Sequence, residues 1–128
     1  MAARTPRAIQ VLVAVPSPTV ARRIAQSLLQ ARLAACIQTL GPVTSRYTWE
    51  GKPESAREWL VLVKTRASRY EAVQLEIRRL HPYEVPEILA LPVLRADPAY
   101  LAWLEESTTA PQPGRGARGQ GRRGPRRR

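Results

Sequence analysis

Apolar and polar positions divide the chain into a series of predicted strands and helices. Residues 9–15 are nearly all apolar and rich in valine, which is typical of a strand buried on both faces. From Pro18 to about residue 34, apolar side chains recur every three to four positions, which predicts an amphipathic helix. Ser17 favours a helix start because its hydroxyl can cap free N–H groups, and proline is tolerated at the first helical position.

Residues 35–49 alternate in the manner of a long strand, with Tyr47 and Trp49 on one face and Arg46 and Thr48 on the other. Gly41-Pro42 interrupts this segment, which indicates a bulge or bend. Residues 58–65 predict a second central strand. The stretch 50–53 has turn chemistry, so the two strands are expected to form a hairpin.

A second helix is predicted from Tyr70 to Leu80. Ser68 and Glu71 have the spacing of a capping box, and His81-Pro82 is expected to end the helix because the residue before proline disfavours the α region. Residues 87–93 predict a fourth strand. Asp97-Pro98 repeats the cap-then-proline pattern and predicts a short last helix.

The order of these elements predicts an α+β fold, a ferredoxin-like βαββαβ sandwich with a short C-terminal helix. In this fold the helices cover one face of an antiparallel sheet, and the other face needs a second layer. The chain offers no further segment for that layer. We therefore expect self-association through the uncovered face of the sheet.

Length and charge define the domain boundaries. A chain of 128 residues suits one modest domain, which we place at residues 9–108 after a flexible N-terminus of residues 1–8. The formal charge is +11, but residues 107–128 contain seven arginines and no acid, so the remainder carries only +4. Residues 109–128 are rich in Arg, Gly and Pro, and we expect them to be disordered. The tail is either a solubilising extension or a weak, non-specific nucleic-acid binder.

Composition also bears on compartment. No apolar run is long enough for a membrane span, and the apolar segment near the N-terminus leads into a helix pattern rather than a cleavage site. Cys36 is the only cysteine, so no intrachain disulfide can form. These features favour a cytoplasmic protein without a membrane partner.

The stretch HPYEVPE, residues 81–87, holds the only histidine and two glutamates between restricting prolines. His81 can be a metal ligand or a cation at a helix C-terminus. Cys36 can be a Cu(I) ligand or a small buried hydrophobe. Glu84 and Glu87 can be acid–base groups, hard-metal ligands or a solvated connection, and Lys64 can bind an anion or pair with one of them.

Catalysis has little support in the sequence. Neither a phosphate-binding loop nor a metalloprotease motif is present, and one histidine and one cysteine form no recognisable triad. We therefore expect a protein that is not an enzyme.

Four stretches together resemble the CutA family of divalent-cation tolerance proteins. They occur in the family's order and span about residues 9–108. They are RLAAC (32–36), YTWEGK (47–52), HPYEVPEI (81–88) and DPAYLAWLEEST (97–108).

The resemblance implies a ferredoxin-like protomer in a homotrimer similar to the PII signalling proteins, with long second and third strands that reach neighbouring subunits. It also implies a role in copper or divalent-cation tolerance, with no cofactor required. The candidate metal ligands are Cys36, His81 and Glu84. At two further positions where some copper-binding members have a cysteine and a histidine, this chain has Val13 and Leu80.

The resemblance places aromatic residues near clefts between subunits, where they either pack or stack on a ligand. The candidate cleft residues are Tyr47, Trp49, Lys64, Tyr83 and Glu87. The resulting hypothesis is a trimer that binds a metal ion or a small ligand in these clefts. The alternatives are a structural or signalling-type trimer without a physiological metal, and nucleic-acid binding through the tail.

Overall fold

The computed structural model describes residues 5–109. Strand β1 (Ala8–Val15) leads into helix α1 (Pro18–Gln30), and strands β2 (Cys36–Trp49) and β3 (Lys52–Arg66) follow as a hairpin. A short 3-10 turn, η1 (Ala67–Arg69), precedes helix α2 (Tyr70–Leu80). Strand β4 (Ile88–Pro92) and helix α3 (Pro98–Ser107) complete the described chain. This order confirms the predicted α+β, ferredoxin-like fold with a short C-terminal helix.

The four strands form one antiparallel sheet in the order β2-β3-β1-β4. Strand β1 lies between β3 and β4, with Val13 opposite both Val61 and Ile88. The central position of β1 explains its almost uniform apolar composition, since it is covered on both edges and packed on one face.

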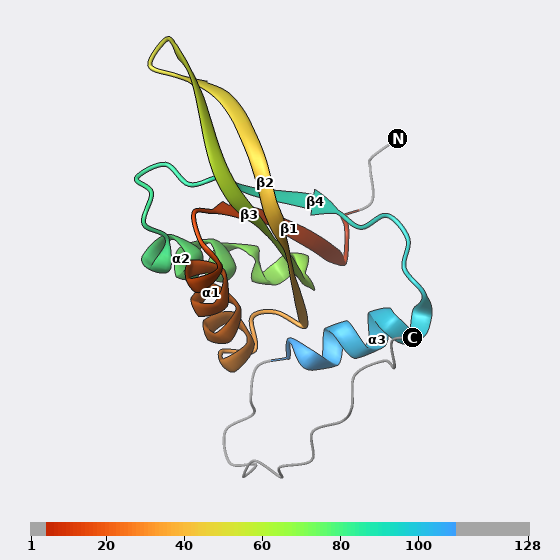
Figure 1. Cartoon of the computed structure of the whole chain (residues 1–128). Coiled ribbons are helices and arrows are strands. Elements are labelled where there is room, and N and C mark those ends of the chain that lie inside the picture. The colour runs from red at the N-terminus through yellow and green to blue at the C-terminus, as the bar shows by residue number, and fades with distance from the viewer. Residues whose placement is uncertain (1–4, 110–128) are drawn as a thin grey trace.

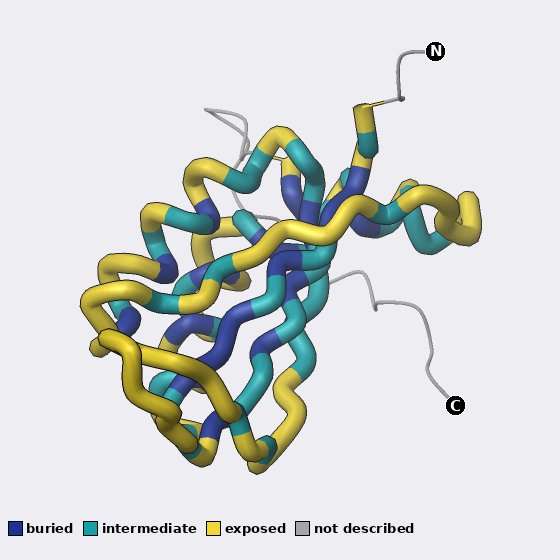
Figure 2. The backbone as a smooth tube through the Cα atoms, turned by 90° about the horizontal axis from the view of Figure 1, so that it is seen from above, coloured by how far each residue is buried: buried dark blue, intermediate teal, exposed yellow. Residues whose placement is uncertain are grey.

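Helices α1 and α2 lie together on one face of the sheet (Figure 1). Their apolar faces enclose the hydrophobic core with side chains from β1 and β3. Figure 2 marks the buried stretches of the backbone in dark blue. Ile24 and Leu28 of α1 and Val73 and Ile77 of α2 are fully buried there. Burial of these side chains against the sheet is the main force that fixes both helices, since isolated helices of this length are marginal in water.

The opposite face of the sheet carries a row of leucines that no helix of the described chain covers. Cross-strand partners share a face, and the register pairs Leu12 with Leu62 and Leu89, and Leu60 with Leu40. Leu40, Leu89 and Leu91 are each about half exposed. We call this surface the leucine face; it comprises Leu12, Leu40, Leu60, Leu62, Leu89 and Leu91.

The β2–β3 hairpin extends well beyond the other two strands and projects as an arm (Figure 1). Strand β1 ends at the pair Val15–Trp59, whereas β2 and β3 continue to pair as far as Trp49–Lys52. The register shifts between Leu40 and Val43, which confirms the irregularity predicted at Gly41-Pro42. Strand β3 begins at Lys52, six residues earlier than predicted, so the paired arm is longer than the sequence indicated.

Helix ends follow local chemistry in two cases and depart from it in a third. Ser17 Oγ accepts from the Val20 N–H at 3.2 Å, and Asp97 Oδ2 accepts from the Tyr100 N–H at 3.1 Å, as predicted. The capping box at Ser68 is wrong, because Ser68 lies inside η1 and α2 begins without a side-chain cap. Helix α1 ends at Gln30, earlier than predicted, because Arg32 takes a positive φ of 57°.

Candidate functional site

A cavity of about 710 Å³ lies between the arm and the loop that joins α2 to β4. We call it the hairpin cavity. It brings together five of the predicted site residues, Tyr47, Trp49, Tyr83, Glu84 and Glu87. The remaining lining residues are Ala14, Ser45, Arg46, Thr48, Glu54, Glu58 and Val85.

The lining residues of the arm are positioned by strands β2 and β3. The loop between α2 and β4 is positioned by His81. His81 ends α2, and its ring is buried against the end of β1, with Nε2 2.7 Å from the carbonyl oxygen of Ala14. The Tyr83 N–H donates to His81 Nδ1 at 3.1 Å. Because an amide N–H can only donate and a carbonyl can only accept, the imidazole carries its proton on Nε2.

This geometry makes His81 a structural residue within the chain. Nε2 carries the ring proton, and the lone pair of Nδ1 accepts from the Tyr83 N–H, so a metal could bind the ring only by breaking one of these contacts. The His81 and Tyr83 rings also pack together, with centroids 4.8 Å apart. His81 therefore orients Tyr83 toward the cavity.

Tyr83 in turn reaches Glu58, a residue that sequence reasoning did not select. The Tyr83 hydroxyl donates to Glu58 Oε2 at 3.2 Å. Burial, and then the charge of Glu58, raise the pKa of Tyr83 above its ordinary value, so the phenol stays protonated and remains a donor. Glu58 is only 6% exposed although it is a carboxylate on a strand.

A signal for Glu58 was present in the sequence. On β3 it lies two positions before Leu60, and the alternation places it on the same face as Leu60 and Leu62. A carboxylate at the end of an apolar row departs from the strand pattern. Its burial depends on Tyr83, 25 residues away, which no local pattern could reveal.

Cys36 and Lys64 lie elsewhere. They are opposite each other on β2 and β3, and Lys64 is opposite Gln10 of β1. Along β1, Gln10 is four residues from Ala14, where His81 is anchored, which separates the two places by about 13 Å. One chain therefore does not bring Cys36 together with His81.

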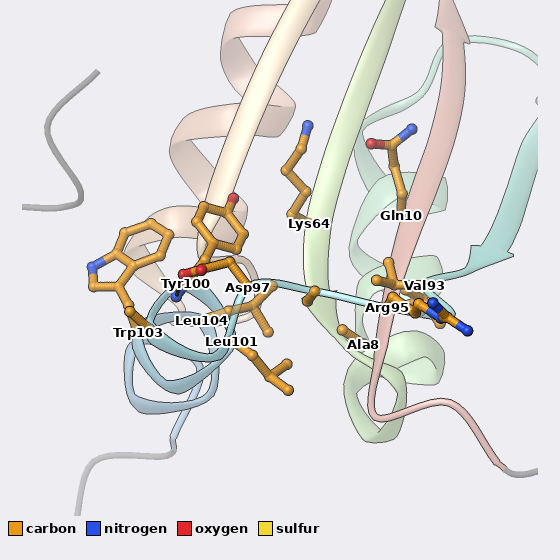
Figure 3. A pocket seen from close by; sticks show the side chains of 13 residues that line it. Ala8, Gln10, Lys64, Val93, Arg95, Asp97, Tyr100, Leu101, Trp103 and Leu104 are labelled. Carbon is orange, nitrogen blue, oxygen red and sulfur yellow. Dashed lines mark hydrogen bonds between the residues drawn. The ribbon is translucent and has the colours of Figure 1, made fainter. Parts of the chain in front are cut away.

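Lys64 belongs to another cavity, of about 760 Å³, between the sheet and α3. Figure 3 shows its side chain beside Gln10, across from Tyr100 and Leu104 of α3. The Lys64 ammonium donates to Gln38 Oε1. The predicted pairing of Lys64 with Glu84 or Glu87 does not fit this position, because both glutamates line the hairpin cavity.

Within residues 5–109, no group of three or more His, Cys, Asp or Glu side chains is arranged to hold a metal ion. The predicted set Cys36, His81 and Glu84 is thus not assembled by a single copy of the described chain. A metal site built from these residues would need ligands from more than one subunit.

Comparison with known proteins identifies the family. A model of the CutA1 divalent ion tolerance proteins matches residues 9–107. The chain belongs to the CutA1 divalent ion tolerance family. This range confirms the family resemblance carried by the four sequence motifs.

Relatives of this CutA1 chain occur in bacteria, animals and plants. It is 45% identical over 98 residues to the divalent-cation tolerance protein CutA of Thermus thermophilus, covering 77% of this chain and 95% of that protein. It is 42% identical over 93 residues to the protein CutA of Mus musculus, covering 73% of this chain and 52% of that protein. The chain thus spans nearly the whole bacterial relative and about half of the mouse relative.

Solved CutA1 structures share the fold. The Thermus thermophilus Cut A1 structure superposes with a TM-score of 0.78 at 43% identity, covering 80% of this chain and 99% of that chain. CutA1 from Oryza sativa gives a TM-score of 0.78 at 38% identity, covering 82% of this chain and 96% of that chain. The structure of CutA from Archaeoglobus fulgidus is described as periplasmic, and a plant relative as chloroplastic. No helix of residues 5–109 has the length and apolarity needed to cross a membrane.

Proposed function

We propose that this CutA1 protein is a homotrimer that binds a small ligand or a divalent cation in clefts between its subunits, and that this binding serves tolerance or response to metal ions. The hairpin cavity is the observation that carries the proposal. It gathers aromatic and carboxylate side chains from the arm and from the α2–β4 loop, which are far apart in sequence. Its volume is in the range of small-molecule sites.

The leucine face supports the trimer. Six leucines lie next to one another on this face, and a contiguous apolar surface with exposed leucines is typical of an interaction site, so a partner is expected to cover it. A second copy of the chain is the economical partner, and the family resemblance implies three copies. Ala14 and Glu58, which line the hairpin cavity, share the face of Leu60, so a neighbour on the leucine face would adjoin the cavity.

A divalent cation is the ion suggested by the description of the relatives as divalent-cation tolerance proteins, and the family resemblance adds copper as the candidate. Glu84 and Glu87 are exposed at the cavity and offer hard oxygen ligands. Cys36 offers a soft ligand and is partly exposed on β2. Since one chain does not assemble these groups, the proposal places a strong metal site between subunits.

We assign the protein no catalytic step and a cytoplasmic location. The only histidine uses both ring nitrogens in structural hydrogen bonds, so it is not available as a general base. A single cysteine with no intrachain disulfide partner suits a reducing compartment.

The three tryptophans provide a direct test. Trp49 lines the hairpin cavity, Trp103 lines the α3 cavity, and Trp59 packs against the core. Their indole N–H signals can be followed by NMR in the full-length protein while CuSO₄ is added, with Trp49→Phe to assign the first signal. Paramagnetic broadening falls steeply with distance, so a metal at the cavity should broaden Trp49 before Trp103.

Broadening of Trp103 first, or equal broadening of all three signals, would contradict a metal site at the hairpin cavity. If CuSO₄ leaves Trp49 unchanged and small organic probes also fail to shift it, the cavity is not a ligand site. The trimer would then be a structural or signalling-type assembly.

A further inference from the structure

Glu58 is a buried carboxylate whose partners are incomplete. Its Oε2 accepts one hydrogen bond, from the neutral hydroxyl of Tyr83. Its other oxygen, Oε1, has no hydrogen-bonding partner among residues 5–109, and no cation of that range forms an ion pair with it. No buried side-chain oxygen of residues 5–109 lacks a hydrogen-bonding partner, so Oε1 keeps contact with solvent and is accessible to a ligand in the cavity. The vacant oxygen lies on a residue that lines the hairpin cavity.

The other charged residues that line the cavity also favour a cation beside Glu58. Four carboxylates line it, those of Glu54, Glu58, Glu84 and Glu87. Arg46 is the single cationic side chain among the lining residues, and it forms no ion pair with a lining carboxylate within the described chain. The lining therefore has an excess of three negative charges, which favours a cation inside the cavity.

Three aromatic residues, Tyr47, Trp49 and Tyr83, line the same cavity. Aromatic faces attract cations that are weakly hydrated and have an apolar body. A bare metal ion needs converging ligands at short range, and the described chain has no such cluster. The volume of about 710 Å³ also exceeds the needs of a single ion and suits a small organic molecule.

We propose that the hairpin cavity binds a small organic cation, whose ammonium group donates to the vacant oxygen of Glu58 and whose apolar body packs against the aromatic residues. This inference rests on the proposed function, because it names the class of ligand for the same site. His81 and Tyr83 act as positioning residues: the ring of His81 fixes the loop, and the Tyr83 hydroxyl holds Glu58.

Benzylamine and benzyl alcohol form a matched pair of probes, since they share size and ring and differ in charge at neutral pH. Each is titrated into the full-length protein, with binding measured by calorimetry and by the shift of the Trp49 indole signal. Benzylamine should bind about tenfold more tightly than benzyl alcohol or better. It should shift Trp49 and leave Trp103 unchanged.

Glu58→Gln removes the charge while it keeps the shape and the acceptor for Tyr83. It should weaken benzylamine binding about tenfold or more and leave benzyl alcohol binding unchanged. Glu71→Gln is the matched control, because Glu71 is exposed on the first turn of α2, away from the cavity lining. It should change neither affinity.

The outcomes separate this inference from the proposed function. If both probes shift Trp49 with equal affinity, or if Glu58→Gln binds benzylamine as well as the natural protein does, the preference for a cation is wrong while the cavity remains a ligand site. If benzylamine does not bind, the inference is also wrong. A side chain of a neighbouring subunit that fills the cavity would give this result, and CuSO₄ broadening of Trp49 would still test the proposed function.

Discussion

At the scale of single residues, a short chain of hydrogen bonds builds the site. The carbonyl of Ala14 holds His81, His81 holds the backbone of Tyr83, and the Tyr83 hydroxyl holds Glu58. Each link joins a different element of the fold, so the position of the Glu58 carboxylate depends on the end of β1 and on the end of α2. His81, a predicted metal ligand, acts within the chain as the anchor of this series of hydrogen bonds.

The Tyr83–Glu58 contact predicts that stability falls at alkaline pH and that Tyr83 titrates late. Burial and the Glu58 charge raise the pKa of Tyr83 in the folded protein, so the unfolded chain loses this proton first as the pH rises. The contribution of this contact to the free energy of unfolding is present below about pH 10, and it is lost as the pH rises through the pKa of Tyr83 in the folded protein. Absorbance titration at alkaline pH should show one late tyrosine, and Glu58→Gln should move it toward its ordinary pKa. An unchanged titration in Glu58→Gln would contradict the contact.

The hydrogen bond between Ser27 of α1 and Glu76 of α2 predicts that stability falls at acidic pH. Glu76 accepts from Arg79 and from Ser27 Oγ, the latter at 2.7 Å, and these hydrogen bonds hold its pKa below the ordinary value of 4.5. This contribution is present above the unfolded pKa and is lost as the pH falls through the lower folded pKa. Urea unfolding midpoints should therefore fall on acidification more steeply in the natural protein than in Glu76→Gln. Parallel pH profiles for the two proteins would show that the pair contributes nothing.

At the scale of elements, the arm and the helix caps show what a sequence can reveal. The caps at Ser17 and Asp97 were predictable because partner and cap are three residues apart. The cap predicted at Ser68 failed because Ser68 lies inside η1, so α2 begins after it without a side-chain cap. The partners of Glu58 and His81 come from distant segments, so the order of elements was predictable while the linked site was not.

A substitution at Gly41 tests the packing of Gly41 against Trp59 at the base of the arm. A Cβ at Gly41 would lie 2.4 Å from Cδ1 of Trp59, at a φ of +155°. Gly41→Ala should therefore lower the free energy of unfolding by about 1–3 kcal/mol, measured by urea denaturation at fixed protein concentration. Gly51→Asn is the control: its Cβ meets nothing within 4 Å, and asparagine tolerates its φ of +77°. Equal unfolding midpoints for the two variants would contradict the packing of Trp59 on Gly41.

At the scale of the whole molecule, charge and apolar surface are separated. The excess of positive charge comes mostly from the C-terminal arginines, whereas the hairpin cavity is acidic and the leucine face is apolar. The predicted tail, residues 109–128, lies outside the described residues except for Thr109. Its role therefore stays a prediction from composition.

Deletion of residues 110–128 tests that prediction. If the tail binds nucleic acid through phosphate contacts, the full chain should bind a single-stranded oligothymidylate at low salt and release it as salt rises. The truncated protein should lose this binding, as measured by fluorescence anisotropy. Equal binding by both proteins would exclude the tail as the binding segment.

The proposed site depends on the trimer, because the proposed clefts lie between subunits and the leucine face needs a cover. Sedimentation equilibrium of the full chain should give three times the chain mass of 14.3 kDa. Leu89→Glu places a charge on the leucine face and should yield the monomer. Leu75→Glu, at an exposed position on α2 away from that face, should remain a trimer. A monomer mass for the natural protein would contradict the assembly and the intersubunit clefts with it.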